Sequence, residues 1–453
     1  MTKQALNTSG SQDPYDLEQL KKLLNDTLQQ ASDLGASAAD AEMSSESGYS
    51  VTVRMGEVET IEYNRDKGLA VTVYFGQRKG SASTTDFQPK AIQETVRAAV
   101  DIARYTAEDE YAGLADAELM AKDIPDLQLY KPWDISPEAA VEQAKECEAA
   151  AFAVDKRLKN SEGAYISTHN GRRVYGNTHG FIAGYDSSRH SLGCTMIGQD
   201  KGEMQRDHWY SVSRHPGQLE PIAQVGQKAG ERTVQRLNAR KLSTCKVPVI
   251  FSAEVARGLL GHFIRAIGGS NLYRKSSFLL DSIGQQIFPD FVQIQEQPHI
   301  LQGLGSSPYD NEGVATQSRF MLQDGVVQGY VLDSYAARRL GMQTTGNAGG
   351  VHNLSINHQD VDLAALLKQM DKGVLVTEVM GQGVNIVTGD YSRGASGFWV
   401  EHGEIQYPVD EFTLAGHLKQ MYRGLQAVAN DVDPRSNFLT GSWLLDEMTI
   451  AGE

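Results

Sequence analysis

The chain has 453 residues, and 42 Lys and Arg against 57 Asp and Glu give it a formal net charge of −15 at pH 7. This length corresponds to roughly two to four domains, and a hydrophobic content of 40% is enough to bury a core. The acidic balance argues against direct nucleic-acid binding, because neutralising phosphates requires clustered Lys and Arg.

The N-terminal segment is polar, and residues 1–14 are predicted to form a disordered tail. It lacks the apolar core of a signal peptide, and no later stretch approaches the ~20 apolar residues that cross a bilayer. Three scattered cysteines suggest neither a disulfide framework nor a Cys-x-x-Cys metal site: Cys147, Cys194 and Cys245. These features favour a cytoplasmic protein without a membrane partner.

Residues 15–238 are predicted to form an N-terminal α+β lobe. Helical spacing of apolar residues predicts helices at 17–31, 92–105, 137–154 and 218–237. Residues 39–83 alternate with a period of two and contain Gly56, Gly68 and Gly76, which predicts a meander of short antiparallel hairpins. Residues 158–212 predict more short strands, with turns at the glycines at 163, 171, 176, 180, 184 and 193.

Residues 240–453 are predicted to form a C-terminal, strand-rich lobe with glycine-punctuated hairpins. An apolar run at 247–251 predicts a buried strand, and helices are expected at 254–267, 360–370 and 413–429. Because strands and helices do not alternate as in βαβ units, the predicted class is α+β with two lobes, the first having helices on an antiparallel sheet.

The common catalytic motifs are absent from the sequence. There is no P-loop, and the glycines at 381, 383 and 389 do not form Gly-x-Gly-x-x-Gly, so turns in tight hairpins are their simpler interpretation. Ser396 lacks the Gly-x-Ser-x-Gly spacing of a nucleophile elbow. Glu57, Glu59 and Glu62 lie around a predicted hairpin, where charged residues usually face solvent.

The histidines give no zinc motif, since neither His-Glu-x-x-His nor His-x-His occurs. His352 and His358 could share one strand face, but a zinc site takes three or four protein ligands. His262 lies on an otherwise apolar predicted helix, directly after Gly261. A packed core histidine and a metal ligand both remain open interpretations of that residue.

Four segments of the second half have a distinctive order of glycines and polar residues. They are Ser-Asn-Leu-Tyr-Arg-Lys-Ser-Ser-Phe-Leu at 270–279, Asp-Asn-Glu-Gly-Val-Ala-Thr at 310–316, Thr-Gly-Asn-Ala-Gly-Gly at 345–350, and the long run at 377–409 that includes Met-Gly-Gln-Gly-Val-Asn-Ile-Val-Thr-Gly-Asp-Tyr-Ser-Arg-Gly-Ala-Ser-Gly. Together they resemble the TldD/PmbA family, most closely its PmbA (TldE) branch. The resemblance extends from about residue 16 to the C-terminus.

The resemblance implies a cytoplasmic, zinc-dependent peptidase built from two related subunits. In the TldD branch, His-Glu-x-x-x-His on one helix binds zinc and activates water, and a late cysteine is a further ligand. This sequence has Arg257, Gly258 and His262 at the three motif positions, and no cysteine follows Cys245. A guanidinium has no lone pair for zinc, and glycine cannot act as a base.

The sequence therefore predicts a PmbA-type subunit with no catalytic or metal-binding residues and no cofactor of its own. Zinc is expected in a TldD-type partner, with which the chain forms a heterodimer, whereas alone it is expected to form a homodimer. The resemblance implies unfolded peptide substrates, including the leader of a peptide antibiotic precursor and an antitoxin. Two alternatives remain: a regulatory protein that binds gyrase or an RNA-binding regulator directly, and an independent metallopeptidase that uses His262 with His352 or His358.

Overall fold

The computed structural model describes residues 15–452, so the tail predicted for residues 1–14 lies outside the described residues. By their internal contacts, these residues divide into two compact units. One comprises the residues up to Tyr49, Glu62–Met120 and Thr168–Ser188, and the other comprises Ser50–Ile61, Ala121–Ser167 and the residues from Arg189 onward. The predicted lobe boundaries at 238 and 240 stay predictions.

The first unit packs two helices on antiparallel strands, as predicted. Helix α1 begins with a capping box. The Asp16 carboxylate accepts a hydrogen bond from the backbone N–H of Gln19, and the Gln19 side-chain oxygen accepts one from the backbone N–H of Asp16. Its apolar face, with Leu20 and Leu24, shares a core with Val71 of β2 and Val96 of α2. The elements are α1 Leu17–Asp33, β1 Ala38–Arg54, β2 Glu57–Phe75, β3 Arg78–Thr84 and α2 Pro89–Tyr105, and the parts of β1 and β2 within residues 50–61 belong to the second unit.

The strands of the first sheet are much longer than the predicted short hairpins, so that prediction was wrong. The sheet has the order β3-β2-β1-β4-β5-β6, with β4 Leu158–Asn177, β5 Ile182–Asp200 and β6 Glu203–Ser213. Gly68 lies within β2, and of the six later glycines only Gly180 occupies a turn. Gly193 shows why a glycine can lie inside a strand instead of at a turn. A Cβ at this position would lie 2.7 Å from the Tyr165 ring, so only glycine leaves the ring enough room. Such glycines allow close packing on a continuous strand.

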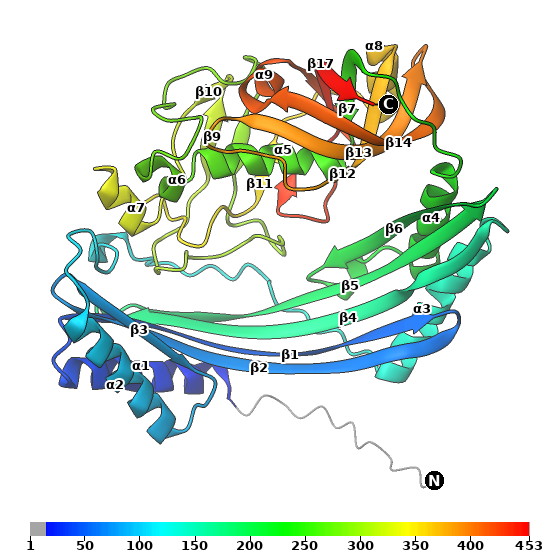
Figure 1. Cartoon of the computed structure of the whole chain (residues 1–453). Coiled ribbons are helices and arrows are strands. Elements are labelled where there is room, and N and C mark those ends of the chain that lie inside the picture. Colours follow the sequence, from blue (N-terminus) through cyan, green and yellow to red (C-terminus); the bar gives the residue numbers. More distant parts are fainter. Residues whose placement is uncertain (1–14, 453) are drawn as a thin grey trace, which may run out of the picture. The chain divides into compact units, whose positions relative to one another are not determined.

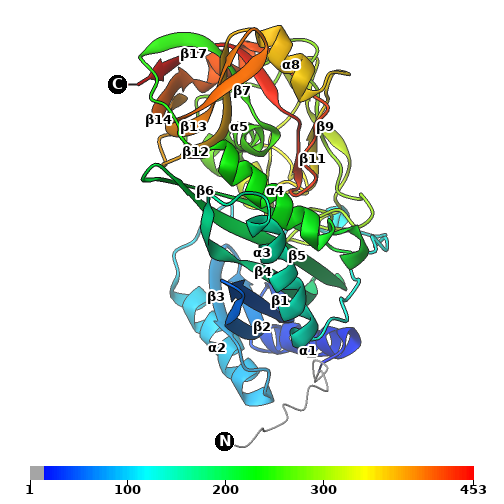
Figure 2. The same cartoon turned by 90° about the vertical axis from the view of Figure 1, so that its right-hand side faces the viewer.

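Two further predicted helices lie side by side in the second unit (Figure 2). They are α3 Pro137–Phe152 and α4 Ile222–Gln235, and α4 also packs on β6. The two helices approach so closely that a Cβ on Gly226 would lie 1.9 Å from the Cys147 carbonyl oxygen. Between α2 and α3 the only regular element described is the short 3₁₀ helix Ala117–Leu119, and a second one, Pro216–Gln218, precedes α4.

The C-terminal region contains a closed ring of strands around a packed core (Figure 1). The sheet order is β14-β13-β12-β7-β17-β15, and β14 also pairs with β17. The predicted buried strand and helix are confirmed as β7 and α5, and Phe263 of α5 contacts the ring of Tyr422. The elements are β7 Cys245–Phe251, α5 Ala253–Ala266, β12 Gly373–Met380, β13 Asp390–Glu401, β14 Glu404–His417, β15 Leu425–Val428 and β17 Trp443–Ala451.

The helix predicted at 413–429 is wrong over most of its length. Strand β14 continues to His417, because Phe412 and Leu414 alternate with more exposed neighbours and pair with β13. Only α9 Leu418–Arg423 is helical, and β15 follows it.

A smaller sheet of order β10-β9-β8-β11-β16 completes the structure. Its strands are short, and β11 and β16 run parallel. The elements are α6 Gly269–Tyr273, β8 Ile294–Glu296, β9 Arg319–Gln323, β10 Val326–Val327, α7 Ser334–Arg339, β11 Leu354–Ile356, α8 Leu363–Met370 and β16 Phe438–Leu439. The mixed α+β class is confirmed. Among residues 15–452, no helix has the length and apolar character needed to cross a membrane.

Candidate functional site

Helix α5 presents all three degenerate motif positions on its less buried side. Its apolar face, including Val255, Leu259 and Phe263, is buried in the core, whereas Arg257, Gly258, Gly261 and His262 are only half-buried. This division follows from the helical period, because residues three and four apart share a face. The prediction that these positions lie on one helix is confirmed.

Arg257 is committed to an ion pair and a hydrogen bond. Its Nη1 lies 3.7 Å from Asp433 Oδ2 and donates to the Tyr210 hydroxyl over 3.3 Å. Asp433 lies on the segment 430–437, which follows β15. The first motif position and this late segment are therefore joined by a guanidinium and a carboxylate.

Gly258 leaves open space beside the helix. A Cβ at this position would meet no heavy atom within 4 Å apart from its chain neighbours and the adjacent backbone of its own helix, so Gly258 offers room but no functional group. A side chain here would meet no steric obstacle, but the residue present has nothing with which to accept a proton from water.

His262 packs near an aromatic ring, and the charges of two arginines act on it. Its ring centroid is 6.3 Å from that of Tyr391, with the planes at 68°. Burial, together with the charges of Arg393 and Arg265, lowers the pKa of His262 to about 4. A neutral imidazole can bind a metal, but positive charges beside it disfavour a cation.

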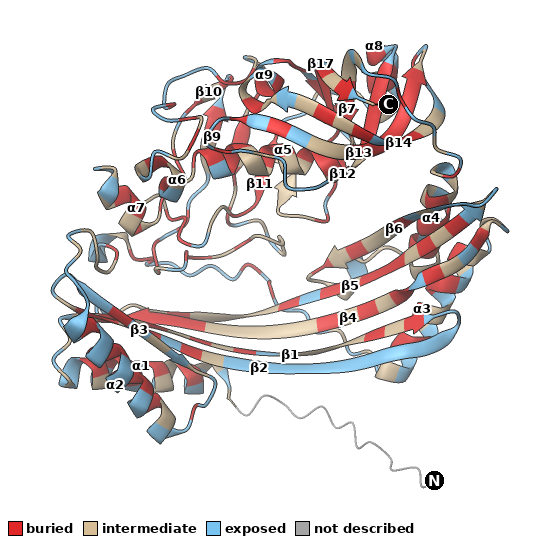
Figure 3. Ribbon diagram, viewed as in Figure 1, coloured by how far each residue is buried: buried red, intermediate tan, exposed pale blue. Residues whose placement is uncertain are grey.

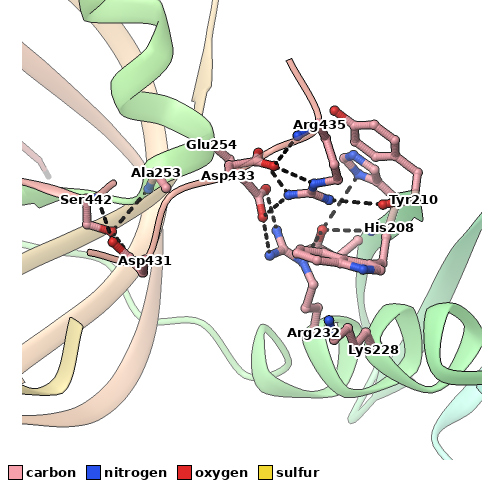
Figure 4. Close-up of polar contacts among 12 residues, drawn as sticks. His208, Tyr210, Lys228, Arg232, Ala253, Glu254, Asp431, Asp433, Arg435 and Ser442 are labelled. Atoms are coloured by element: carbon pink, nitrogen blue, oxygen red, sulfur yellow. Dashed lines mark hydrogen bonds and ion pairs between the residues drawn. The ribbon is translucent and has the colours of Figure 1, made fainter. Parts of the chain in front are cut away.

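The centre of the site is a cluster of paired charges around Arg435 (Figure 4). Arg435 binds Asp433 through two nitrogens, at 2.8 and 3.1 Å, and lies 3.0 Å from Glu254. Its guanidinium carbon is 3.7 Å from the centroid of the Trp209 ring, a cation–π contact. Burial opposes its charged form, but Asp433 and Glu254 outweigh burial, so the pKa of Arg435 lies above its ordinary value.

Helix α4 supplies the second layer of this cluster. Arg232 makes a forked contact with both carboxylate oxygens of Glu254, at 3.0 and 3.2 Å, and Arg236 lies 3.5 Å from Asp207 on β6. Arg236 also reaches Glu378 of β12 at 2.5 Å. The cluster therefore joins β6, α4, α5, β12 and the 430–437 segment through charge-assisted hydrogen bonds.

A cavity of about 470 Å³ adjoins these charges. Its lining combines the charged residues with apolar ones that include Leu363, Leu375 and Phe398. Its volume is within the range of small-ligand sites, but the cations of its wall are already bound to carboxylates.

The remaining sequence candidates do not join this site. His352 is buried elsewhere, with its Nδ1 2.9 Å from Glu296 Oε1, and His358 lies at the surface. Glu57, Glu59 and Glu62 are exposed on β2. Ser396 is buried and bonded to Arg236 and Glu378, in a position that gives it structural contacts.

The residues present do not suit a zinc ion. Compared with the motif that the resemblance implies, arginine stands at the position of the first histidine ligand, glycine stands at that of the base, and only His262 is kept. No cluster of three or more His, Cys, Asp and Glu side chains able to hold a metal is found among residues 15–452. The absence of a cofactor nevertheless stays a prediction. Sequence reasoning missed Trp209, Arg232, Glu254 and Arg435, and the only signal for them was the late segment 430–437, which contains both Asp433 and Arg435.

Family models match most of the chain. The PmbA/TldA metallopeptidase domain 1 matches residues 39–103, the central domain matches 130–237, and the C-terminal domain matches 244–452. The chain therefore belongs to the PmbA/TldE family of metallopeptidases, which confirms the resemblance seen in the sequence.

Individual relatives agree with this assignment. The chain is 50% identical to metalloprotease PmbA of Escherichia coli O157:H7, covering 96% of this chain and 98% of that one. A solved structure from Bacteroides thetaiotaomicron, named as a putative modulator of DNA gyrase, superposes with a TM-score of 0.91 at 29% identity, covering 96% of this chain and 99% of that chain.

Haemophilus influenzae has two proteins similar to this chain. Its metalloprotease PmbA homolog is 49% identical, covering 96% of both chains. Its metalloprotease TldD homolog is 22% identical, covering 83% of this chain and 82% of that one. One organism thus encodes a close relative and a distant relative of this chain.

The environment of His262 predicts a pH dependence of stability. Because its pKa is about 4 in the folded chain and about 6.5 when unfolded, the unfolded state binds more protons between these values. The free energy of unfolding should therefore fall as the pH drops from about 6.5 towards about 4. Urea titrations at neutral and mildly acidic pH should show a smaller fall for His262→Gln than for wild type. His358→Gln, at the surface, is the control; parallel profiles for wild type and His262→Gln would refute the assignment.

Proposed function

We propose that this chain is the PmbA/TldE-type subunit of a two-component zinc metalloprotease and does not itself hydrolyse peptides. The observation that carries the proposal is the ion pair of Arg257 with Asp433, which joins the first motif position to the late segment. Zinc at that place would compete with a guanidinium that is already held by a carboxylate, and like charges repel.

The coexistence of PmbA and TldD homologs in Haemophilus influenzae supports a division of labour. A TldD-type partner would supply zinc, its ligands and the general base, and this chain would complete the assembly in the cytoplasm. From the family we also infer unfolded peptide substrates, including an antibiotic leader and an antitoxin. When no partner is present, the chain would pair with itself, since related subunits often keep a common association surface.

The test compares three preparations: this chain alone, a TldD-type chain alone, and their equimolar mixture. Each is assayed for cleavage of an unfolded peptide and for bound zinc. We expect neither zinc nor cleavage in this chain alone, and cleavage at its highest in the mixture. Stoichiometric zinc together with cleavage by this chain alone would overturn the proposal and favour an independent metallopeptidase.

A matched variant separates chemistry from assembly. Gly258→Ala adds a methyl group in open space at the position of the lost general base. If the position has no chemical role, the mixture containing this variant should cleave peptide at the wild-type rate.

The alternative of a regulatory protein that binds gyrase directly has its own test. It predicts a stable complex of this chain with gyrase in the absence of any TldD-type chain.

A further inference from the structure

Strand β2 leaves more than half its length at the surface. Every residue from Glu57 to Lys67 is exposed, as the pale blue stretch of β2 in Figure 3 shows. In the sheet order, β3 lies on one side of β2. Strand β3 pairs only with residues Leu69–Phe75 of β2. Within the described residues, the edge of β2 over 57–67 is thus open on that side. An open edge presents backbone donors and acceptors to another strand.

The side chains along this edge have an ordered pattern. Alternate residues share a face of a strand, so one face carries two acids, then two apolar residues, then two bases: Glu57, Glu59, Ile61, Tyr63, Arg65 and Lys67. Ile61 and Tyr63 are 43% and 61% exposed, which is unusual for large apolar side chains in the middle of a strand.

This pattern is complementary to itself when the strand is reversed. If two copies pair antiparallel about a two-fold axis at Glu62, Glu57 faces Lys67, Glu59 faces Arg65, and Ile61 faces Tyr63. Each opposite-charge pair then occurs twice by symmetry. On the other face of the strand this register places the two Glu62 side chains opposite each other, and this one like-charge pair opposes the four opposite-charge pairs. Shifting the axis to residue 61 or 63 removes the like-charge pair but keeps only one of the two kinds of opposite-charge pair, so the balance of charges favours the register centred on Glu62.

We infer that the open edge of β2, residues 57–67, is a self-association surface on which a second copy of this chain adds its own β2 antiparallel, with Glu62 on the two-fold axis. The inference rests on the self-association part of the proposed function and names the surface that performs it. Backbone hydrogen bonds would supply the pairing, and the charged residues would fix its direction and register.

Several side chains of this face make contacts within the chain and are nevertheless exposed; the Tyr63 ring centroid, for example, lies 5.8 Å from that of Tyr49. Glu59 lies 3.6 Å from Arg54, and both side chains are more than two-fifths exposed. The Lys67 ammonium is 5.1 Å from the Phe87 ring centroid, and the residue remains exposed. Exposed ion pairs contribute little, so Glu59 can turn from Arg54 to a partner copy at small cost.

The first experiment is a charge reversal followed by sedimentation equilibrium of the full chain. Arg65→Glu places a second carboxylate opposite Glu59 in both symmetry-related pairs, so repulsion replaces attraction, and we expect the dimer to dissociate roughly ten-fold more readily. Combining Glu59→Arg with Arg65→Glu restores opposite charges, so the double variant should regain wild-type association. Lys90→Glu makes the same charge change at an exposed site on α2 and should leave association unchanged.

A second experiment reads the register directly. With Cys245 replaced by serine, Glu62→Cys should form an intermolecular disulfide under a mild oxidant such as diamide, because the two sulfurs face each other across the axis. Thr60→Cys is the matched control: its two copies would lie about four residues apart along the strands, roughly 13 Å, and should not crosslink.

The outcomes separate the two proposals. A monomeric wild-type chain would overturn the proposed self-association as a whole. A dimer that is unaffected by Arg65→Glu and is not crosslinked by Glu62→Cys would leave self-association standing and overturn the β2 surface. Pairing of Glu62→Cys only with a TldD-type chain would also contradict a second copy as the occupant.

Discussion

Replacing Arg435 with alanine is expected to lower the free energy of unfolding by about 3–5 kcal/mol, the usual loss when one partner of a buried ion pair is removed. The side chains of Arg435 and Asp433 are each only 6% exposed. Without the guanidinium, Asp433 would keep only the more distant Arg257 as a cation. The stacking of Arg435 on the Trp209 ring would be lost as well.

Urea unfolding at neutral pH tests this expectation, with Arg206→Ala as the control. Arg206 also forms a close ion pair, with Glu162 at 2.7 Å, but both side chains are well exposed. Its removal should therefore cost no more than about 1 kcal/mol. Equal effects of the two substitutions would show that the Arg435 cluster is no stronger than a surface contact.

The site shows how far sequence reasoning reaches. Arg257, Gly258 and His262 were placed on one helix from local spacing, because the helical period is set within a few residues. Their partners were not found, since Asp433 is 176 residues from Arg257 along the chain and no periodicity links them. Ion pairs between distant segments are set by tertiary packing, which leaves no local signal in a single sequence.

The same difference between local patterns and long-range contacts decided which parts of the fold could be predicted. Helices α1 to α5 were predicted because apolar residues recur at helical spacing in each segment. The long strands were missed because glycines such as Gly193 were interpreted as turns, whereas that glycine makes room for the Tyr165 ring. Whether a glycine turns the chain or admits a neighbour depends on a residue elsewhere in the sequence.

Gly226→Ala is expected to lower the free energy of unfolding by about 2–3 kcal/mol, because its methyl group would overlap the Cys147 carbonyl oxygen of α3. A separation of 1.9 Å between that methyl carbon and the oxygen can be relieved only by moving backbone, not by turning a flexible side chain. The loss should appear although alanine is the better helix former by about 1 kcal/mol. Gly258→Ala is the matched control: it lies within α5 with nothing nearby, so it should stabilise the chain by about 0.5–1 kcal/mol.

The same substitution tests whether α4 holds the charged cluster in place. Moving α4 away from α3 would also displace Arg232 from Glu254, the carboxylate that Arg435 shares. The combined variant Gly226→Ala with Arg435→Ala should therefore lose less stability than the two single losses added together, because both weaken one network. Strictly additive losses in the free energy of unfolding would mean that the packing of α3 on α4 and the charges around Arg435 act independently. The cluster would then take its geometry from α5 and the 430–437 segment alone.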